Sequence, residues 1–290
     1  LDVQSITPEL QQLLTPIMIQ AGAAYNQKYA YLRCERTKQI MNKKLVAAIA
    51  CRNQGTRLYG KPLQNLDVNN GIRIIDNVID CLKTIDIIDE IVLGISEGVE
   101  NEVFKSIAKQ HQIKFIIGDE DDVLQRLILC GDKANATDIF RITSESPFLY
   151  FEAVNTIWDS HVINNRDVSF YEDVVDGVGF EIISLNSLKL SHKNGDKRHR
   201  SELCTLYIRE NLEKFNVKKY KPLKQLIRKD LRLTVDNPED LVICRELYSK
   251  FKDKAPRIPV LELIKYLDKN PKLKELVFPF TEKGYSTMYL

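Results

Sequence analysis

The chain has 290 residues, enough to bury a large hydrophobic core, and its 42 basic and 40 acidic residues give a formal net charge of +2. This balance argues against a dedicated nucleic-acid-binding or polybasic membrane surface, although it is compatible with a local basic pocket. No apolar run reaches the roughly 18 residues of a membrane-spanning helix, and no secretory signal is visible. We therefore expect no nucleic-acid or membrane partner. The first residue, Leu1, suggests a piece excised from a longer product.

Six cysteines are scattered through the chain without a Cys-x-x-Cys pair. They are Cys34, Cys51, Cys81, Cys130, Cys204 and Cys244. We expect reduced, mostly buried thiols rather than disulfides or zinc ligands, which favours a cytoplasmic protein. Cys51 stands beside a cationic loop, where its pKa could fall, but we assign its thiol a structural role.

Residues 1–43 are predicted to form one or two amphipathic helices, over 8–14 and 24–41. This extension belongs to no motif that we recognise. It could pack on the following domain, mediate oligomerisation or be the tail of a fused neighbour.

The stretch Leu45–Leu63 begins with an apolar run and continues as a polar loop. Leu45–Ile49 has the small and β-branched residues of a strand buried on both faces of a parallel sheet. In open α/β sheets, ligands bind at the carboxyl ends of such strands. The loop carries three cations there, Arg52, Arg57 and Lys61, which would converge on a polyanion such as a triphosphate. The alternative is an ordinary solvated surface loop.

The loop follows neither of the common phosphate-binding patterns. Lys61 is followed by Pro62 rather than by the Ser or Thr of a Walker motif, and no G-x-G-x-x-G is present. Gly55 and Gly60 permit close backbone approach or a positive φ angle.

Strands and helices alternate through the rest of the chain. Helices are predicted over 73–84, 99–111, 153–162 and 259–267 and from Pro238, and strands over 90–96, 114–118, 138–143, 167–172 and 231–235. An apolar strand is also expected at Ile182 and Ile183, and a basic run at 197–200 is expected to open the helix that carries Tyr207. This alternation predicts an α/β fold with a mostly parallel sheet and helices on both faces.

An acidic run, residues 119–122, follows one of the predicted strands. Its plainest explanation is an N-cap with charges that favour the positive end of the helix dipole. Asp119 and Asp121 also form a D-x-D, the metal-binding signature of many glycosyltransferases.

Three segments resemble, in the same order, motifs of the sugar cytidylyltransferases, the group of CMP-KDO synthetase, acylneuraminate cytidylyltransferase and spore-coat polysaccharide cytidylyltransferase. Cys51–Lys61 is similar to A-R-x-x-S-x-R-x-x-G-K, Arg141–Pro147 to R-I-T-G-D-x-P, and Leu233–Leu241 to L-T-V-D-T-P-E-D-L. The resemblance covers roughly residues 45–252 and implies a three-layer, Rossmann-like nucleotide-diphospho-sugar-transferase fold. It also implies transfer of CMP from CTP to a sugar or acidic sugar, with release of pyrophosphate, for surface polysaccharide or glycoconjugate biosynthesis.

The resemblance assigns roles to individual residues. Phosphate-binding, catalytic roles fall to Arg52, Arg57 and Lys61. Nucleotide contacts are implied for Cys51, Arg52, Asn53, Gly55, Thr56, Arg57, Lys61, Asp122, Arg126 and Arg141. The cofactor is Mg²⁺, with Glu145 and Asp236 as its ligands. The acceptor pocket is expected to involve Asp176, Glu181, His199, Arg200 and Glu202.

The chain departs from the family pattern at several of these positions. Glu145 and Ser144 stand where the family has Asp and Gly, and the longer Glu side chain requires an adjusted loop, an intervening water or a weakened metal site. Gly179 replaces an Asp of the acceptor region, and Leu203 replaces a His. Asp236 could serve instead as the N-cap of the following helix.

The resulting domain prediction is a helical extension (1–43), a nucleotidyltransferase domain (44–255) and a C-terminal helical cap and tail (256–290), with a possible homodimer contact in the tail. Three alternatives remain open at this point. They are a glycosyltransferase that uses Asp119 and Asp121, a non-catalytic nucleotide-binding module, and a nucleotidyltransferase with a nucleotide other than CTP.

Overall fold

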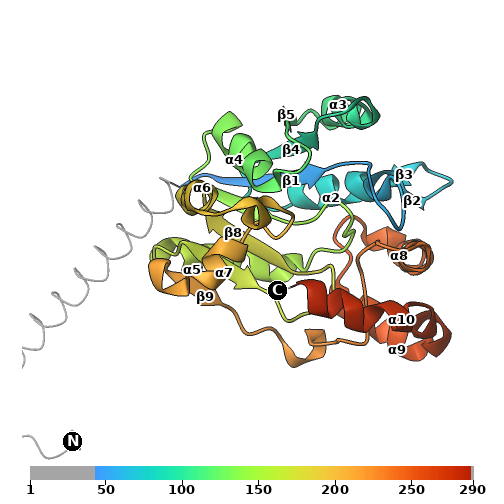
Figure 1. Ribbon diagram of the computed structural model, residues 1–290. Helices are drawn as coiled ribbons and strands as arrows, with labels where there is room; N and C mark the ends of the chain where they lie inside the picture. The colour runs from blue at the N-terminus through green and yellow to red at the C-terminus, as the bar shows by residue number, and fades with distance from the viewer. Residues whose placement is uncertain (1–42, 289–290) are drawn as a thin grey trace, which may run out of the picture. The chain divides into compact units, whose positions relative to one another are not determined.

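A computed structural model describes residues 43–288, and their side chains as far as Glu282. The predicted N-terminal extension therefore lies outside the described residues, apart from Lys43. The main strands are β1 (Leu45–Cys51), β4 (Glu90–Ser96), β5 (Lys114–Gly118), β6 (Asp138–Arg141), β7 (Val168–Tyr171), β8 (Phe180–Ser184) and β9 (Val217–Lys219). They form one sheet in the order β5-β4-β1-β6-β8-β7-β9, in which β8 runs antiparallel to both of its neighbours (Figure 1). The expected mostly parallel α/β sheet is confirmed.

Helices lie on both sides of this sheet (Figure 1). They are α2 (Ile74–Lys83), α3 (Val103–His111), α4 (Val123–Lys133), α5 (Val154–Ile163), α6 (Leu185–Asn194), α7 (Leu206–Glu210), α8 (Pro238–Phe251), α9 (Val260–Lys269) and α10 (Pro271–Met288). The helices predicted over 73–84, 99–111, 153–162 and 259–267 are confirmed, with small shifts at their ends. The hairpin β2 (Asn65–Asp67) and β3 (Ile72–Arg73), helix α6 and strand β9 were not predicted from the sequence.

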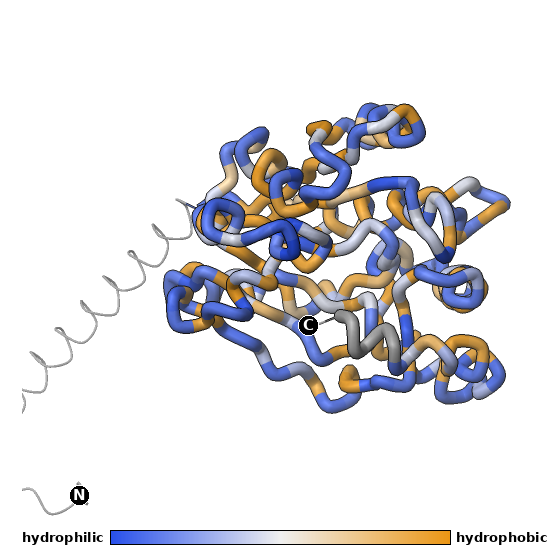
Figure 2. Tube along the Cα trace, viewed as in Figure 1, coloured by the Kyte–Doolittle hydropathy of each residue, from blue (hydrophilic) through white to orange (hydrophobic). Residues whose placement is uncertain are grey.

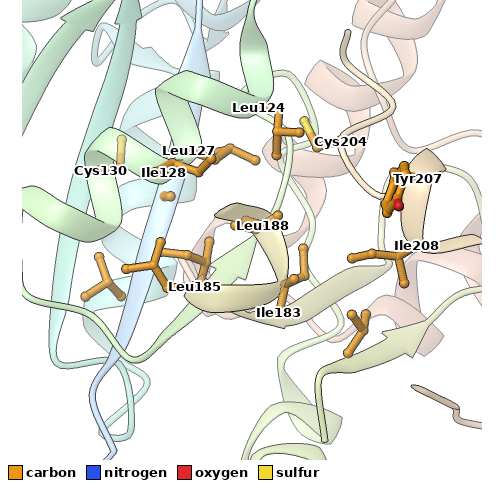
Figure 3. Packing of buried hydrophobic residues seen from close by; sticks show 14 of the residues in the cluster. Leu124, Leu127, Ile128, Cys130, Ile183, Leu185, Leu188, Cys204, Tyr207 and Ile208 are labelled. Carbon is orange, nitrogen blue, oxygen red and sulfur yellow. The ribbon is translucent and has the colours of Figure 1, made fainter. Parts of the chain in front are cut away.

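Both faces of the central strand are buried, as the apolar run of β1 predicts. On one face, α4 and α6 pack on the sheet through a cluster that includes Leu127, Ile183 and Leu188 (Figure 3). On the other face, Leu45 and Ile49 of β1 are also fully buried. Figure 2 shows hydrophobic residues along the strands and hydrophilic residues in many of the outer turns. The sheet is thus the middle layer of the fold.

Two sequence predictions are wrong. Residues 231–235 are buried but do not form a strand, because their backbone N–H groups bond to two different segments: Leu233 N to the carbonyl of Asp176, and Val235 N to that of Glu145. The basic run Lys197–Arg200 forms its own 3₁₀ turn and does not open the helix of Tyr207, which begins only at Leu206.

The sheet order places the predicted motifs next to each other. Strands β1 and β6 are parallel neighbours, so the loops that follow Cys51 and Arg141 leave the sheet at the same edge. The Trp158 side chain of α5 is buried in the core, as expected. In the part of the chain that the structure describes, no helix is both long and apolar enough to cross a membrane.

Candidate active site

The cationic loop after β1 is held in a tight conformation by its glycines and by Asn53. Gly60 has a φ angle of 62°, in the left-handed region that favours glycine, and its N–H donates to the Asn53 carbonyl at 2.8 Å. A Cβ atom on Gly55 would lie 2.4 Å from the carbonyl oxygen of Leu58. The close approach and the positive φ angle expected at these two glycines are therefore both present.

Two cations of this loop meet the predicted metal ligand Asp236. Lys61 Nζ lies 2.6 Å from Asp236 Oδ1, and Arg57 Nη2 lies 3.0 Å from the same oxygen. Burial opposes ionisation of Asp236, but these cations and Arg232 outweigh it and hold the pKa of Asp236 below its usual value. Asp236 is therefore a carboxylate surrounded by positive charge. It is not the N-cap of α8, because that position belongs to Asn237.

Glu145, the second predicted metal ligand, lies beside Asp236. The Val235 N–H donates to the Glu145 carbonyl at 3.0 Å, which joins the loop after β6 to the segment before α8. Burial raises the pKa of the Glu145 carboxyl, Lys61 opposes this shift, and the charge of Asp236 adds to it. The Ser144 hydroxyl, where the family has Gly, donates to Glu145 Oε2 at 3.0 Å. The replacement at 144 thus supports the longer acidic side chain at 145.

A first cavity of about 330 Å³ lies between the β1 loop, the start of α4 and the β6 loop. Its walls include the nucleotide-binding residues expected from the sequence, with one exception, Asp122. They are Cys51, Arg52, Asn53, Gly55, Thr56, Arg57, Lys61, Arg126 and Arg141. Arg126 is almost fully buried, and its guanidinium donates to the carbonyl oxygens of Asp119 and Glu120. Its Nε has no hydrogen-bond partner in the structure.

A second cavity of about 290 Å³ shares the Lys61 and Glu145 side of the first. The predicted acceptor residues Asp176, Glu181 and Glu202 line it. Glu181 is not an edge-strand surface charge, because β8 lies inside the sheet. Burial opposes ionisation of Glu181, but two guanidinium groups outweigh it and keep the pKa of its carboxyl low. Arg141 lies 2.7 Å from Glu181 and Arg209 lies 3.0 Å from it.

Arg232 is a site residue that sequence reasoning missed. Its side chain is 1% exposed, and it lies 2.7 Å from Asp176, 2.8 Å from Asp236 and 3.2 Å from Asp240. It also donates to the Phe280 carbonyl of α10 at 3.2 Å. Burial of Asp176 raises its pKa to about 6 despite the nearby Arg232. The available signal was a single charged residue within the buried apolar segment 231–235.

Three predicted site residues lie elsewhere. Asp122 caps α4 through the Gln125 N–H at 2.8 Å and accepts from His192, so the capping explanation of the acidic run is correct. His199 is buried against Glu210. Arg200 donates to the His192 carbonyl. None of the three lines either cavity.

Two further expectations are settled by burial and local bonding. Burial raises the pKa of the Cys51 thiol, so the neighbouring cations do not activate it. The five cysteines within residues 43–288 are free and buried, as expected.

Asp119 accepts hydrogen bonds from the backbone N–H groups of Asp121 and Asp122, both at 2.8 Å, and so caps this loop. Among the described residues, no group of three or more Asp, Glu, His or Cys side chains is arranged to hold a metal ion.

The fold and the two joined cavities are those of a nucleotidyltransferase. The family model for cytidylyltransferases matches residues 46–277, and the chain belongs to this family, the sugar cytidylyltransferases. The chain is 26% identical over 243 residues to the uncharacterized protein MJ1063 of Methanocaldococcus jannaschii, covering 83% of this chain and 98% of that protein. It is 25% identical over 228 residues to the spore coat polysaccharide biosynthesis protein SpsF of Bacillus subtilis, covering 77% and 93%.

Solved structures agree with this fold. A cytidylyltransferase from Leptospira borgpetersenii superposes with a TM-score of 0.72 at 23% identity, over 80% of this chain and 97% of that one. CMP-2-keto-3-deoxy-manno-octonic acid synthetase, solved with CTP, superposes with a TM-score of 0.54 at 15% identity, over 72% and 99%. At these identities the likeness establishes the fold alone.

Proposed function

We propose that this protein transfers CMP from CTP to a hydroxyl group of a sugar-type acceptor in a Mg²⁺-dependent reaction that releases pyrophosphate. The observation that carries the proposal is the contact of Lys61 with Asp236, two residues 175 positions apart that come from the phosphate motif and the metal motif. SpsF is named for spore coat polysaccharide biosynthesis, which supports a role in surface polysaccharide or glycoconjugate synthesis.

The reaction requires positioning and charge neutralisation rather than a covalent intermediate on the protein. Arg52 and Arg57 can bind phosphate oxygens through two N–H groups each, and Lys61 supplies a compact positive charge. All three line the first cavity. These groups would stabilise the charge that moves to the leaving pyrophosphate.

Arg126, which also lines the first cavity, is suited to contact the nucleotide. Its guanidinium is fixed by two backbone carbonyls, and its buried Nε retains an unused hydrogen. A buried donor without a partner costs free energy, so an acceptor atom of the bound nucleotide would relieve that cost.

The residues present fit a magnesium ion. Mg²⁺ is usually held by one or two carboxylates together with substrate phosphates and water. Glu145 and Asp236 line the same cavity, and the charge of Asp236 raises the pKa of Glu145, an effect that a cation between the two carboxyl groups would offset. When bound, the ion would neutralise phosphate charge and polarise the attacking hydroxyl. Lys61 reaches the same carboxylate and would orient the phosphates beside it.

Labelled CTP tests the proposal. With label on the α-phosphate, the proposal expects label in the sugar product, and with label on the γ-phosphate it expects label in pyrophosphate. The assay would compare all four nucleoside triphosphates, with and without Mg²⁺, against a panel of sugars, acidic sugars and sugar phosphates. Transfer of a sugar from a ready-made nucleotide sugar, without release of pyrophosphate, would establish a glycosyltransferase and contradict the proposal.

A further inference from the structure

The two carboxyl side chains that the proposed function assigns to Mg²⁺ come from segments far apart in the chain. Glu145 lies in the loop after β6, and Asp236 lies just before α8. Magnesium demands near-ideal octahedral geometry, so carboxylates that share one ion have to be held at a fixed separation. The contacts that join these two segments therefore help to form the site.

A backbone hydrogen bond is the first of these contacts. The Val235 N–H donates to the Glu145 carbonyl at 3.0 Å, which bonds the residue before one carboxylate directly to the residue that carries the other. A single hydrogen bond still permits rotation about its axis. A second contact beside it is needed to fix the relative orientation of the two segments.

A chain of three hydroxyl groups supplies this second contact. Thr143 Oγ1 lies 2.6 Å from Ser146 Oγ, and Ser146 Oγ donates to Thr234 Oγ1 at 3.0 Å. Because a hydroxyl has one hydrogen to donate, Thr143 is the donor in the first of these bonds. The Ser146 hydroxyl is thus the middle member, which accepts from its own loop and donates to the segment before α8.

The bond between Ser146 and Thr234 is shielded from solvent. The two residues are 7% and 6% exposed, and both line the second cavity together with Glu145 and Asp236. A buried hydroxyl that loses its partner is not compensated by bulk water, so this bond is favoured over an open arrangement of the two segments.

The loop after β6 is also anchored on its far side. The buried Asn77 side chain of α2 donates from Nδ2 to the Pro147 carbonyl at 2.8 Å. Since this bond restrains the end of the loop that faces α2, the position of the loop relative to Asp236 depends on the bonds made through Val235 and Ser146.

We propose that Ser146 and Thr234 are positioning residues of the magnesium site, and that the bond between their hydroxyl groups holds Glu145 and Asp236 at the separation that the ion requires. Position 146 is the unspecified x of R-I-T-G-D-x-P, so the family pattern assigns it no role. The inference rests on the proposed function, because it takes Glu145 and Asp236 as the ligands.

Calorimetric titration of the whole chain with CTP, once in excess EDTA and once in excess Mg²⁺, tests the inference. The ratio of the dissociation constant in EDTA to that in Mg²⁺ measures what the ion adds to CTP binding. In Ser146→Ala and in Thr234→Val this ratio should fall by about tenfold, as when a group that orients a metal ligand is lost. The dissociation constant in EDTA should stay close to that of the parent, because the phosphate-binding cations are unchanged.

Two further variants separate the hydroxyl bond from packing. Thr234→Ser retains the hydroxyl and should retain the ratio of the parent, whereas Thr234→Val retains the shape without the hydroxyl. Ser187→Ala is the matched control and should leave the ratio unchanged. Ser187 is buried outside both cavities, and its hydroxyl is likewise bonded to that of another serine, Ser184, at 2.7 Å.

The outcomes distinguish the inference from the proposed function. If the parent shows the Mg²⁺ effect and Ser146→Ala shows the same ratio, the inference is overturned while the proposed function stands, even where urea unfolding finds the variant less stable. A loss in Thr234→Ser as large as that in Thr234→Val would assign the effect to packing and would also overturn the inference. A parent that binds CTP equally in EDTA and in Mg²⁺ would overturn both.

Discussion

Lys61 Nζ lies 2.6 Å from Asp236 Oδ1, and this contact joins the loop after β1 to the segment before α8. The opposite oxygen of the same carboxylate accepts from Arg232 Nη2 at 2.8 Å. One acidic side chain is thus fixed on both oxygens by cations from distant parts of the chain. The predicted phosphate-binding motif and the predicted metal-binding motif, which lie far apart in the sequence, are therefore in contact at Asp236.

Lys61→Ala should reduce the turnover of CTP by about 10²–10³-fold, the usual effect of removing one charge-stabilising donor from an active site. The fold should survive, because Lys61 lies in a partly exposed loop. Steady-state pyrophosphate release and circular dichroism would measure both effects. Lys250→Ala, at an exposed position of α8, is the control. Turnover near that of the control would remove Lys61 from the phosphate site.

Asp236→Asn should abolish the Mg²⁺-dependent part of the activity, since the amide retains the shape of the side chain but loses the charge that a hard cation requires. Titration of activity and of CTP binding with Mg²⁺ would show the effect. Glu145→Asp restores the acid of the family pattern and should retain Mg²⁺ dependence. If the Mg²⁺ dependence of Asp236→Asn matched that of the parent protein, Asp236 would not be a ligand.

Arg232→Met should destabilise the fold by about 3–5 kcal/mol, because three acidic side chains lose the buried cation that they share. Arg228→Met is the matched control. Arg228 also bonds two carboxylates, Asp230 and Asp268, at 2.7 Å, but these lie near the surface, where such pairs contribute about 0–1 kcal/mol. Urea unfolding of both variants would measure the difference. Equal losses would mean that burial does not decide the importance of Arg232.

Asp138 provides a test of stability against pH away from the site. Burial opposes its ionisation, but His161 at 3.0 Å and Lys43 at 3.0 Å outweigh this effect and hold the pKa of Asp138 below its usual value of 3.8. Because the folded-state pKa is the lower one, the contribution of Asp138 to stability is present above about pH 4 and is lost as the pH falls through the folded pKa.

Asp138→Asn should therefore lower the free energy of unfolding at neutral pH by about 1–3 kcal/mol. Below pH 4 the stability of this variant should fall less steeply with pH than that of the parent. Urea titrations from pH 3 to pH 7 would measure both effects, with Asp86→Asn at an exposed position as the control. Parallel pH profiles for parent and Asp138→Asn would exclude this contribution.

Local patterns were sufficient to predict the sheet and most of its helices. The apolar run of β1 and the helical spacing in α2 are properties of neighbouring residues, and both elements are confirmed. The segment 231–235 has the same apolar character, but it forms no strand because its partners, Asp176 and Glu145, lie on separate segments. Sequence patterns do not show which segment will be the neighbour of another.

The same limit applies to the site. The loop cations line the first cavity because their motif is local and lies at the end of a buried strand. His199 and Arg200 were predicted to contact the acceptor because they belong to the basic run 197–200. The position of that run is set by helix α6 and the turn after it, which the sequence did not predict. Arg232 was missed because its three carboxylate partners are brought together only by the tertiary fold.

Calorimetric titration of the protein with the four nucleoside triphosphates, in the presence of Mg²⁺, tests the central claim most directly. The account predicts saturable binding of CTP at least about tenfold tighter than that of ATP, GTP or UTP, a difference of about 1.4 kcal/mol, and predicts that Lys61→Ala weakens this binding while Lys250→Ala does not. Tighter binding of another triphosphate, or CTP binding that is indifferent to Lys61→Ala, would contradict it.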